Sequence, residues 1–289
     1  MIRIATRGSD QALTQARAVA DQLTAAGHEC DLVVISTYGD RTQATNVPLH
    51  TIGGQGVFVK EVQVAVLDGR ADIAVHSAKD LPTTPTEGLT IGAFTERRSP
   101  ADALIGRPLV DLPTGARVAT GAVRRRAQLH RARPDLEFVE LRGNILSRLE
   151  KVPDGGSIVM AVAALEILEM TDRIAEILDP AEFVPAVGQG CVAIECSDRN
   201  DRLLAALSDV DHARTRHEVT VERAFLAELG SGCALPIGAH VDGQRLYTFL
   251  ADEQAGVTVS DTFELPDVLV DAVEIARSAA KAAHEHVSR

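Results

Sequence analysis

The sequence predicts an α/β protein with two α/β domains around a cleft and a small C-terminal α+β domain. Short β-branched runs alternate with helical patterns in two successive series, which is typical of βαβ units and mainly parallel sheets. A segment rich in Pro and Gly at residues 184–190 closes the second series. At 289 residues the chain is long enough for two or three domains of ordinary size.

The first series alternates strand and helix patterns over the first third of the chain. Strand patterns occupy residues 2–5, 32–36 and 73–76, and helical patterns occupy residues 12–25 and 58–67. Each helical pattern lies between two strand patterns, so we expect one α/β sheet with helices on its faces.

The second series begins after a turn at residues 97–100. Its predicted strands lie at residues 118–120, 138–141 and 157–162, and its predicted helices at residues 124–131 and just before Lys151. This order repeats the first series and predicts a second, similar α/β domain.

The last third of the chain has a different order of elements. Residues 191–196 alternate as a strand that we expect to return to the first domain. A helix ending near Leu229, three strand-like runs and a final helix from about Asp267 then predict a small α+β domain.

We therefore place domain 1 at residues 1–96 and 190–210, domain 2 at 97–189 and domain 3 at 211–289. Two α/β lobes joined by crossing strands resemble periplasmic-binding-protein-like folds, in which the ligand lies between the lobes at the carboxyl ends of strands. The sequence thus predicts a cleft between domains 1 and 2.

Composition and charge exclude several classes of protein. The net charge of −12 argues against nucleic acid and anionic membrane as partners. No apolar run reaches the roughly 20 residues that span a bilayer. Residues 1–7 enter a strand pattern without a signal peptide, so we expect a cytoplasmic protein.

Positive charge is concentrated in one segment. Residues 97–151 hold twelve Lys or Arg and six Asp or Glu, which makes this segment +6 and the rest of the chain −18. An acidic protein with one basic domain is expected to bind a small anion there.

The four cysteines form no CxxC pair and have no neighbouring His at zinc-finger spacing, so we expect neither a metal site nor a disulfide framework. Cys191 and Cys196 lie in an apolar strand pattern, where a cysteine acts as a small hydrophobic residue. Cys233 lies in a loop of small residues at positions 230–234, and a thiol accessible in such a loop is a possible attachment point.

Four arginines lie where strands of the second domain end. Arg124 and Arg125 open a predicted helix, whereas Arg142 and Arg148 follow the next strand. A guanidinium binds carboxylate or phosphate through two parallel hydrogen bonds. A run of charges is often only a solvated helix face, but the acidity of the surrounding chain favours a site for an anion with several charges.

Asp80 ends a polar cluster that follows the apolar strand at residues 73–76 and precedes Pro82. A carboxylate in this position could stabilise a cationic intermediate or exchange protons with substrate nitrogens. The alternative is a helix cap or a turn residue. The glycine-rich residues 53–56 lack the spacing of a phosphate-binding loop and are interpreted as a flap over the cleft.

Taken together, the motifs resemble the hydroxymethylbilane synthase (porphobilinogen deaminase) family over residues 3 to about 240. The motifs that carry the resemblance are RIATR at 3–7 with Ser9, GGQGVFVKE at 53–61, AVHSAKD at 74–80, Arg124-Arg125, LRGN at 141–144 with Arg148, PAVGQG at 185–190, and Gly232-Cys233 with PIG at 236–238. So many motifs in one order are specific.

The resemblance implies a transferase of porphyrin, tetrapyrrole and heme biosynthesis. In this family a dipyrromethane cofactor, built from substrate, is attached through a thioether that Cys233 would provide. Four porphobilinogen molecules are then added head to tail, and hydrolysis releases hydroxymethylbilane. The family also suggests a monomer.

The resemblance further implies the roles of individual residues. Asp80, with Lys79, would assist the loss of ammonia and stabilise an azafulvene-type cation. Cys233, Arg124, Arg125, Lys79 and Asp80 would hold the cofactor. The substrate-binding residues would be Arg7, Ser9, Lys60, Arg142, Arg148 and Gln189.

Several positions depart from the family pattern. Gly121-Ala122 replace two serines, Ala164 replaces a glycine, and Ile167 replaces a substrate-binding arginine. Gln55 and Ser231 are milder changes. These departures motivate two alternatives: a paralogue that makes a shorter or different pyrrole product, and a non-catalytic two-lobe protein that binds anions.

Overall fold

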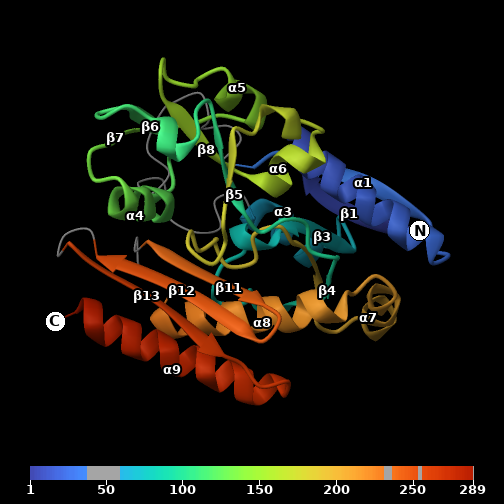
Figure 1. Ribbon diagram of the computed structural model, residues 1–289. Helices are drawn as coiled ribbons and strands as arrows, with labels where there is room; N and C mark the ends of the chain where they lie inside the picture. Colours follow the sequence, from blue (N-terminus) through green and yellow to red (C-terminus); the bar gives the residue numbers. More distant parts are fainter. Residues whose placement is uncertain (38–58, 231–235, 253–255, 289) are drawn as a thin grey trace.

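The computed structural model describes residues 1–37, 59–230, 236–252 and 256–288. Its strands form two five-stranded sheets and one three-stranded sheet. Each sheet takes its strands from one of the three predicted domains, and we refer to the three units as the first lobe, the second lobe and the C-terminal unit (Figure 1). The predicted fold class is confirmed, whereas the exact domain boundaries stay predictions.

The first lobe is built on a sheet with the order β2-β1-β3-β10-β4. Its strands are β1 (Ile2–Arg7), β2 (Cys30–Ile35), β3 (Ile73–Ser77), β4 (Leu89–Phe94) and β10 (Val192–Ser197). Its helices are α1 (Asp10–Ala25), α3 (Lys60–Leu67), the 3₁₀ turn η3 (Ala78–Asp80) and α7 (Asp201–Ser208).

Helices cover both faces of this sheet because each carries an apolar stripe at helical spacing. Ala16, Val19 and Leu23 of α1 pack with α7 on one face, and the apolar side of α3 packs on the other. Ser9 begins α1 by accepting a hydrogen bond from the Ala12 N–H at 3.4 Å.

The second lobe repeats this arrangement on a sheet with the order β7-β6-β8-β5-β9. Its strands are β5 (Asp102–Ile105), β6 (Arg117–Ala119), β7 (Glu137–Val139), β8 (Ser157–Ala161) and β9 (Glu176–Leu178). Its helical segments are η4 (Leu109–Asp111), α4 (Val123–Ala132), α5 (Ile145–Leu149), α6 (Val162–Ile167) and η5 (Thr171–Arg173).

The expectation of mainly parallel sheets is wrong for half of the strand pairs described in the two lobes. β1 lies parallel to β2 and β3, and β6 lies parallel to β7 and β8. β10 is antiparallel to β3 and β4, and β5 is antiparallel to β8 and β9. β10 and β5 are the strands through which the chain enters each lobe from the other, and they run against the βαβ strands of that lobe.

The C-terminal unit consists of α8 (Ala213–Leu229), β11 (Ile237–Asp242), β12 (Arg245–Asp252), β13 (Val257–Glu264) and α9 (Leu269–Val287). Both helices pack on one face of the three-stranded sheet, around Phe225, Leu246 and Ala276. α8 also contacts β4 of the first lobe, so this helix joins the two units (Figure 1).

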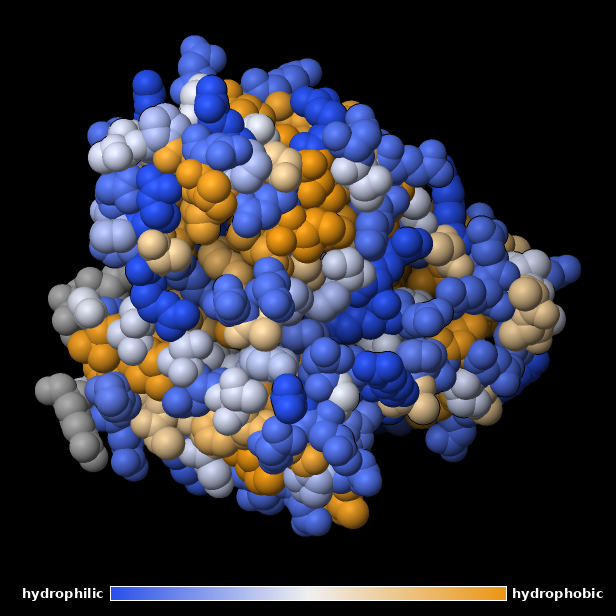
Figure 2. Space-filling model, in the orientation of Figure 1, coloured by the Kyte–Doolittle hydropathy of each residue, from blue (hydrophilic) through white to orange (hydrophobic). Residues whose placement is uncertain are grey.

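Hydrophilic side chains cover much of the face drawn in Figure 2, and they also gather where the upper, second lobe meets the C-terminal unit. Among the described residues, no helix is both long and apolar enough to cross a membrane.

Candidate functional site

Lys79 and Asp80 follow β3 in the short turn η3, at the edge of the first lobe that faces the second lobe. The Ala78 N–H donates to the Cys191 carbonyl at 2.9 Å, and the Leu81 N–H donates to the Ala78 carbonyl at 3.3 Å. These two bonds fix the turn between a buried strand and Pro82. Asp80 is therefore a turn residue and at the same time a neighbour of the charged groups described below.

Arg124 and Arg125 lie in the first turn of α4, and both point into the protein. Arg124 donates to Asp102 at 2.7 Å and to the Val184 carbonyl at 2.6 Å. Arg125 donates to the other oxygen of Asp102 at 2.7 and 3.0 Å and to the Val159 carbonyl at 2.9 Å. The interpretation as a solvated helix face is wrong for these two arginines, which are 6% and 8% exposed.

Asp102, the first residue of β5, is completely buried between these guanidiniums. Burial alone would raise the pKa of its carboxyl, but Arg124 and Arg125 lower that pKa far below its ordinary value. One carboxylate thus faces two permanent cations. The two arginines together with Asp102 therefore leave one net positive charge inside the protein.

Lys79 lies close to this surplus. Burial and the neighbouring Arg125 lower the pKa of Lys79 to about 8, while Asp80 and Asp102 act in the opposite direction. Its Nζ atom donates to Gln189 Oε1 at 3.2 Å. Lys79 is therefore a half-buried amine whose lowered pKa makes its charge sensitive to pH just above neutrality.

Arg142 and Arg148 extend the cationic cluster from the loop after β7. Burial, Arg125 and Arg142 lower the pKa of Arg148 to about 10, while Asp80 acts in the opposite direction. Arg148 Nε donates to the Gly143 carbonyl at 2.7 Å. The buried Nη2 atom of Arg142 has no hydrogen-bond partner among the described residues, so it has capacity to bind an anion.

The structure therefore brings together seven of the predicted site residues, counting Gln189. We name Lys79, Asp80, Arg124, Arg125, Arg142 and Arg148 the cationic cluster. Gln189 is 1% exposed, and both ends of its side-chain amide are hydrogen-bonded inside the protein. Its predicted contact with substrate stays a prediction.

Three other predicted residues lie at the ends of first-lobe elements. Arg7 ends β1 and is half-buried, and Ser9 caps α1. Lys60 is exposed at the first position of α3. No hydrogen bond or ion pair given for Ser9 or Lys60 joins either to the cationic cluster in the described part of the chain, so their roles stay predictions.

Two predicted features lie outside the described residues. These are the attachment residue Cys233 and the flap at residues 53–56. Cys191 and Cys196 are buried, as the strand pattern predicts. Burial raises the pKa of the Cys191 thiol to about 12 and that of Cys196 to about 11, so both are unreactive at neutral pH.

The departures from the family pattern lie beside the cationic cluster. The residue before α4 is Ala122, which offers no side-chain cap, and its N–H donates to Thr120 Oγ1 at 3.2 Å. Ile167, the last residue of α6, lines a cavity of about 30 Å³ between the lobes together with Lys79 and Arg98. The apolar side chain of Ile167 thus occupies a position where a basic side chain would add a positive charge to the cationic cluster.

Asp102 is the functional residue that sequence reasoning missed. A signal for it exists, because Asp102 is the only charged residue in the apolar run 101–105 and buried acids need a cationic partner. The adjacent Arg124 and Arg125 are the partners. Groups of three or more His, Cys, Asp or Glu that could hold a metal do not occur among the described residues.

The arrangement can bind a small polyanion and hold a carboxylate beside it. The cluster carries five cations, and the buried Asp102 neutralises only part of their charge. Several carboxylates of one ligand could thus be bound in a poorly hydrated space, where charge-assisted hydrogen bonds are strong. Asp80, which acts electrostatically on Lys79 and Arg148, would then lie beside the bound ligand.

Comparison with known families agrees with this chemistry. Residues 2–205 match the family described as porphobilinogen deaminase, dipyromethane cofactor binding domain. Residues 216–284 match porphobilinogen deaminase, C-terminal domain. The two matches together span nearly the whole chain.

Curated relatives carry the same name. A porphobilinogen deaminase of Syntrophotalea carbinolica is 41% identical over 283 residues, which is 94% of this chain and 89% of the relative. One from Mycobacterium marinum is 47% identical over 244 residues, covering 83% of this chain and 76% of the relative. One from Thermobifida fusca is 46% identical over 247 residues with the same coverage.

Solved structures with a related outline are more distant. A nutrient binding protein from Burkholderia cenocepacia bound to methionine has a TM-score of 0.45 at 14% identity, covering 74% of this chain and 93% of that chain. The methionine binding protein MetQ has a TM-score of 0.44 at 13% identity, covering 75% and 94%.

Proposed function

Since the chain belongs to the porphobilinogen deaminase family, we propose that its cationic cluster binds the carboxylates of the dipyrromethane cofactor and of porphobilinogen. The family is a transferase of tetrapyrrole biosynthesis, and its reaction condenses porphobilinogen with loss of ammonia to give hydroxymethylbilane. The observation that carries the proposal is the surplus of buried and half-buried guanidiniums in the cluster that contains Asp80.

The residues present fit such a cofactor. Each pyrrole of this series carries two carboxylates, so a dipyrromethane needs several cationic partners within a small space. The buried, unpartnered Nη2 of Arg142 and the excess charge of Arg124 and Arg125 over Asp102 supply them. When bound, the cofactor supplies the covalent primer to which pyrrole units are added.

The chain's own residues would divide the remaining work. Arg124, Arg125, Arg142 and Arg148 bind and orient carboxylates, because planar guanidiniums fix both position and direction. Lys79 adds a further donor when protonated. The Asp80 carboxylate accepts a hydrogen bond from the substrate and stabilises the positive charge that develops as ammonia leaves.

We further propose that Cys233 attaches the cofactor and that Arg7, Ser9 and Lys60 contact the substrate. Cys233 follows the last residue of α8 by four positions, and its neighbours in the sequence have small side chains. The acidic net charge of −12 supports a protein without nucleic-acid or membrane partners. By analogy with the family it would act as a cytoplasmic monomer, which size-exclusion chromatography with light scattering can test.

The intact mass of the purified protein tests the attachment. We expect the wild type to exceed the mass of the bare polypeptide by two linked pyrrole units and the Cys233→Ser variant to have the bare mass. Cys191→Ser is the matched control and should keep the added mass, because its thiol is buried and protonated. An unmodified wild type that releases no ammonia from porphobilinogen would leave an anion-binding protein as the better interpretation.

A second candidate is a family member that makes a shorter or different pyrrole product. Ile167 beside Lys79 and the absence of side-chain hydroxyls at Gly121-Ala122 favour it, since both reduce the donors available to carboxylates. Mass spectrometry of products formed from porphobilinogen separates the two candidates. A linear tetrapyrrole supports the first, and di- or tripyrroles as main products support the second.

A further inference from the structure

Gln189 lies in the second of the two chain segments that cross between the lobes, just before β10. Its Oε1 atom accepts a hydrogen bond from Lys79 of the first lobe at 3.2 Å. Its Nε2 atom donates to Asp102 at 3.0 Å and to the Pro100 carbonyl at 2.7 Å. One amide thus contacts the cationic cluster from both lobes.

The orientation of this amide follows from its partners. The ammonium group of Lys79 can only donate hydrogen bonds, whereas a carboxylate and a main-chain carbonyl can only accept them. The amide oxygen must therefore face Lys79, and the amide nitrogen must face Asp102 and Pro100. Among uncharged side chains of this length, only glutamine offers both a strong acceptor and two donors.

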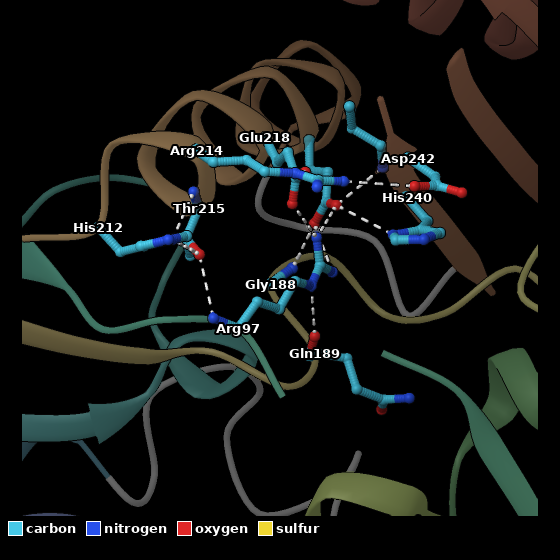
Figure 3. Close-up of polar contacts among 11 residues, drawn as sticks. Arg97, Gly188, Gln189, His212, Arg214, Thr215, Glu218, His240 and Asp242 are labelled. Atoms are coloured by element: carbon cyan, nitrogen blue, oxygen red, sulfur yellow. Dashed lines mark hydrogen bonds and ion pairs between the residues drawn. The ribbon is translucent and has the colours of Figure 1, made fainter. Parts of the chain in front are cut away.

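The main chain of Gln189 is held from the other side. Arg97, on the first crossing segment, donates through Nε to the Gln189 carbonyl at 3.0 Å (Figure 3). The same guanidinium bonds to Glu222 of α8 at 2.6 and 3.3 Å. Glu222 also accepts from the Gly188 N–H at 2.7 Å. Both crossing segments are therefore fixed to one helix.

This helix connects the contacts to the rest of the proposed site. α8 ends at Leu229, four residues before Cys233. A continuous series of hydrogen bonds runs from α8 through Arg97 and Gln189 to Lys79 and Asp102. The place of the Lys79 ammonium group in the cluster is thus held in part by Gln189.

We propose that Gln189 is a positioning residue that acts through Lys79 and Asp102, rather than a ligand of the substrate. The inference rests on the proposed function, in which the cationic cluster binds carboxylates. Gln189 keeps the Lys79 ammonium directed at one place in the cluster and holds the second lobe, through Asp102, at a fixed distance from it.

The charge of Lys79 offers a readout that a purely structural role would not change. Lys79 is faced by Arg124 and Arg125 of α4, by Asp80 of its own turn and by Asp102 of β5. Glu96 and Arg98 line the same small cavity. Removing the acceptor at Gln189 destabilises the ammonium form, so the pKa of Lys79 must fall further.

The test compares Gln189→Leu with Gln63→Leu in the cofactor-loaded enzyme. Gln63 is a matched control: it is buried in α3, donates to Glu195 at 2.8 Å and accepts from Thr86 at 3.1 Å, all within the first lobe. We expect both variants to lower the melting temperature. Only Gln189→Leu should move the alkaline limb of kcat/KM to lower pH, with about a tenfold loss at pH 8 to 9.

An alkaline limb that stays in place in Gln189→Leu, or that moves equally in Gln63→Leu, would overturn the inference. If Gln189→Leu does not fold, Gln189→Asn keeps the amide but shortens its reach, and the same shift is expected from it. A wild type that lacks both the added pyrrole mass and activity contradicts the proposed function. A wild type that has both, combined with unshifted variants, contradicts only the role of Gln189.

Discussion

Two carboxylates, Asp102 and Glu222, are completely buried among the described residues, and their charges are balanced in different ways. Asp102 lies between two guanidiniums and the Gln189 amide. Glu222 has one guanidinium, that of Arg97, together with the His240 ring and the main-chain N–H groups of Gly188 and Val241. At Asp102 the two positive charges exceed the one negative charge of the carboxylate. At Glu222 one cation balances the carboxylate, and the remaining hydrogen bonds come from neutral donors.

The difference distinguishes a binding site from a structural contact between domains. We call the contacts of Glu222 with Arg97, Gly188, His240 and Val241 the interdomain joint. A buried cation without a full counter-charge is costly in free energy, and a ligand that brings negative charge relieves that cost. At Glu222 the second acid Glu218 lies 3.7 Å from Arg97, so this joint has no cation to offer. The excess of guanidinium groups in the cluster that contains Asp80 therefore supports the proposed ligand site, whereas the fully hydrogen-bonded Glu222 supports a structural role between domains.

Removing Arg97 should have the largest effect on stability. Arg97→Met leaves Glu222 buried without its cation, and breaking a buried ion pair in this way costs about 3–5 kcal/mol. Denaturant unfolding of the cofactor-loaded protein measures the loss. Arg277→Met, which removes an exposed pair with Glu274 at 2.6 Å, is the control and should change stability by less than about 1 kcal/mol.

Removing Arg124 should cost less stability and more function. Asp102 Oδ1 keeps Arg125 and Gln189, and the Val184 carbonyl keeps the Gln128 amide at 3.0 Å. Arg124→Met therefore leaves the buried carboxylate with one cation, although its Oδ2 atom loses the hydrogen bond from Arg124. We expect a loss of about 1–3 kcal/mol in the unfolding free energy. We also expect a fall of at least about tenfold in kcat/KM for porphobilinogen. A stability loss as large as that of Arg97→Met would contradict the comparison.

Low pH should destabilise the fold by protonating both buried carboxyl groups. The effect can be tested at Glu222, in the interdomain joint. Burial alone would raise the pKa of Glu222, but Arg97 and His240 lower it to about 2, against an ordinary value of 4.5. A carboxyl with a lowered pKa in the folded state stabilises the fold above its ordinary pKa, and this contribution disappears as pH falls toward the lowered value. Stability should therefore decrease from pH 4.5 toward pH 2.

Unfolding curves recorded through this pH window check the assignment. Glu222→Gln should have a shallower dependence on pH between 4.5 and 2, because its amide does not titrate. Glu264→Gln, which changes an exposed partner of Arg245, is the control and should follow the wild type. Parallel slopes for the wild type and Glu222→Gln would show that Glu222 is not the group lost in acid.

The sequence predicts the helices and strands of the fold more completely than the contacts between its domains. Strand and helix patterns locate β1, α1, β3 and α4 within a few residues, because each buries an apolar face of regular period. The strand β10 is predicted, but its antiparallel direction is not, since periodicity gives no strand direction. The antiparallel strand β5 is not predicted at all. Their direction depends on where the chain crosses between lobes, which is a property of the tertiary structure.

The sequence predicts which residues belong to the site, but it does not predict the hydrogen bonds and ion pairs that connect them. Positions after strands identify Asp80 and Arg124 as cleft residues. The patterns give no hint that Arg124 and Arg125 share Asp102 or that Gln189 joins Lys79 to that carboxylate. Such contacts connect residues between 22 and 110 positions apart in the chain, so only the packed structure brings them together.

The smallest expected effect concerns Ile167, where the comparison can be extended by adding a cation. Ile167 lines the small cavity beside Lys79 and Arg98, and Glu96 lies on the same wall. Ile167→Arg adds one positive charge beside the cationic cluster and does not alter the contacts of Glu222. We expect KM for porphobilinogen to fall about two- to fivefold, as for one partly solvated charge-assisted hydrogen bond.

The same variant should raise the fraction of the longest product, because a growing chain adds two carboxylates with each pyrrole. Ile167→Met, which fills similar space without charge, is the control. Product lengths are read by mass spectrometry after a single exposure to excess porphobilinogen. If Arg and Met give the same KM and the same products, cation number beside Lys79 does not limit elongation, and the positive excess around Asp102 serves the cofactor alone.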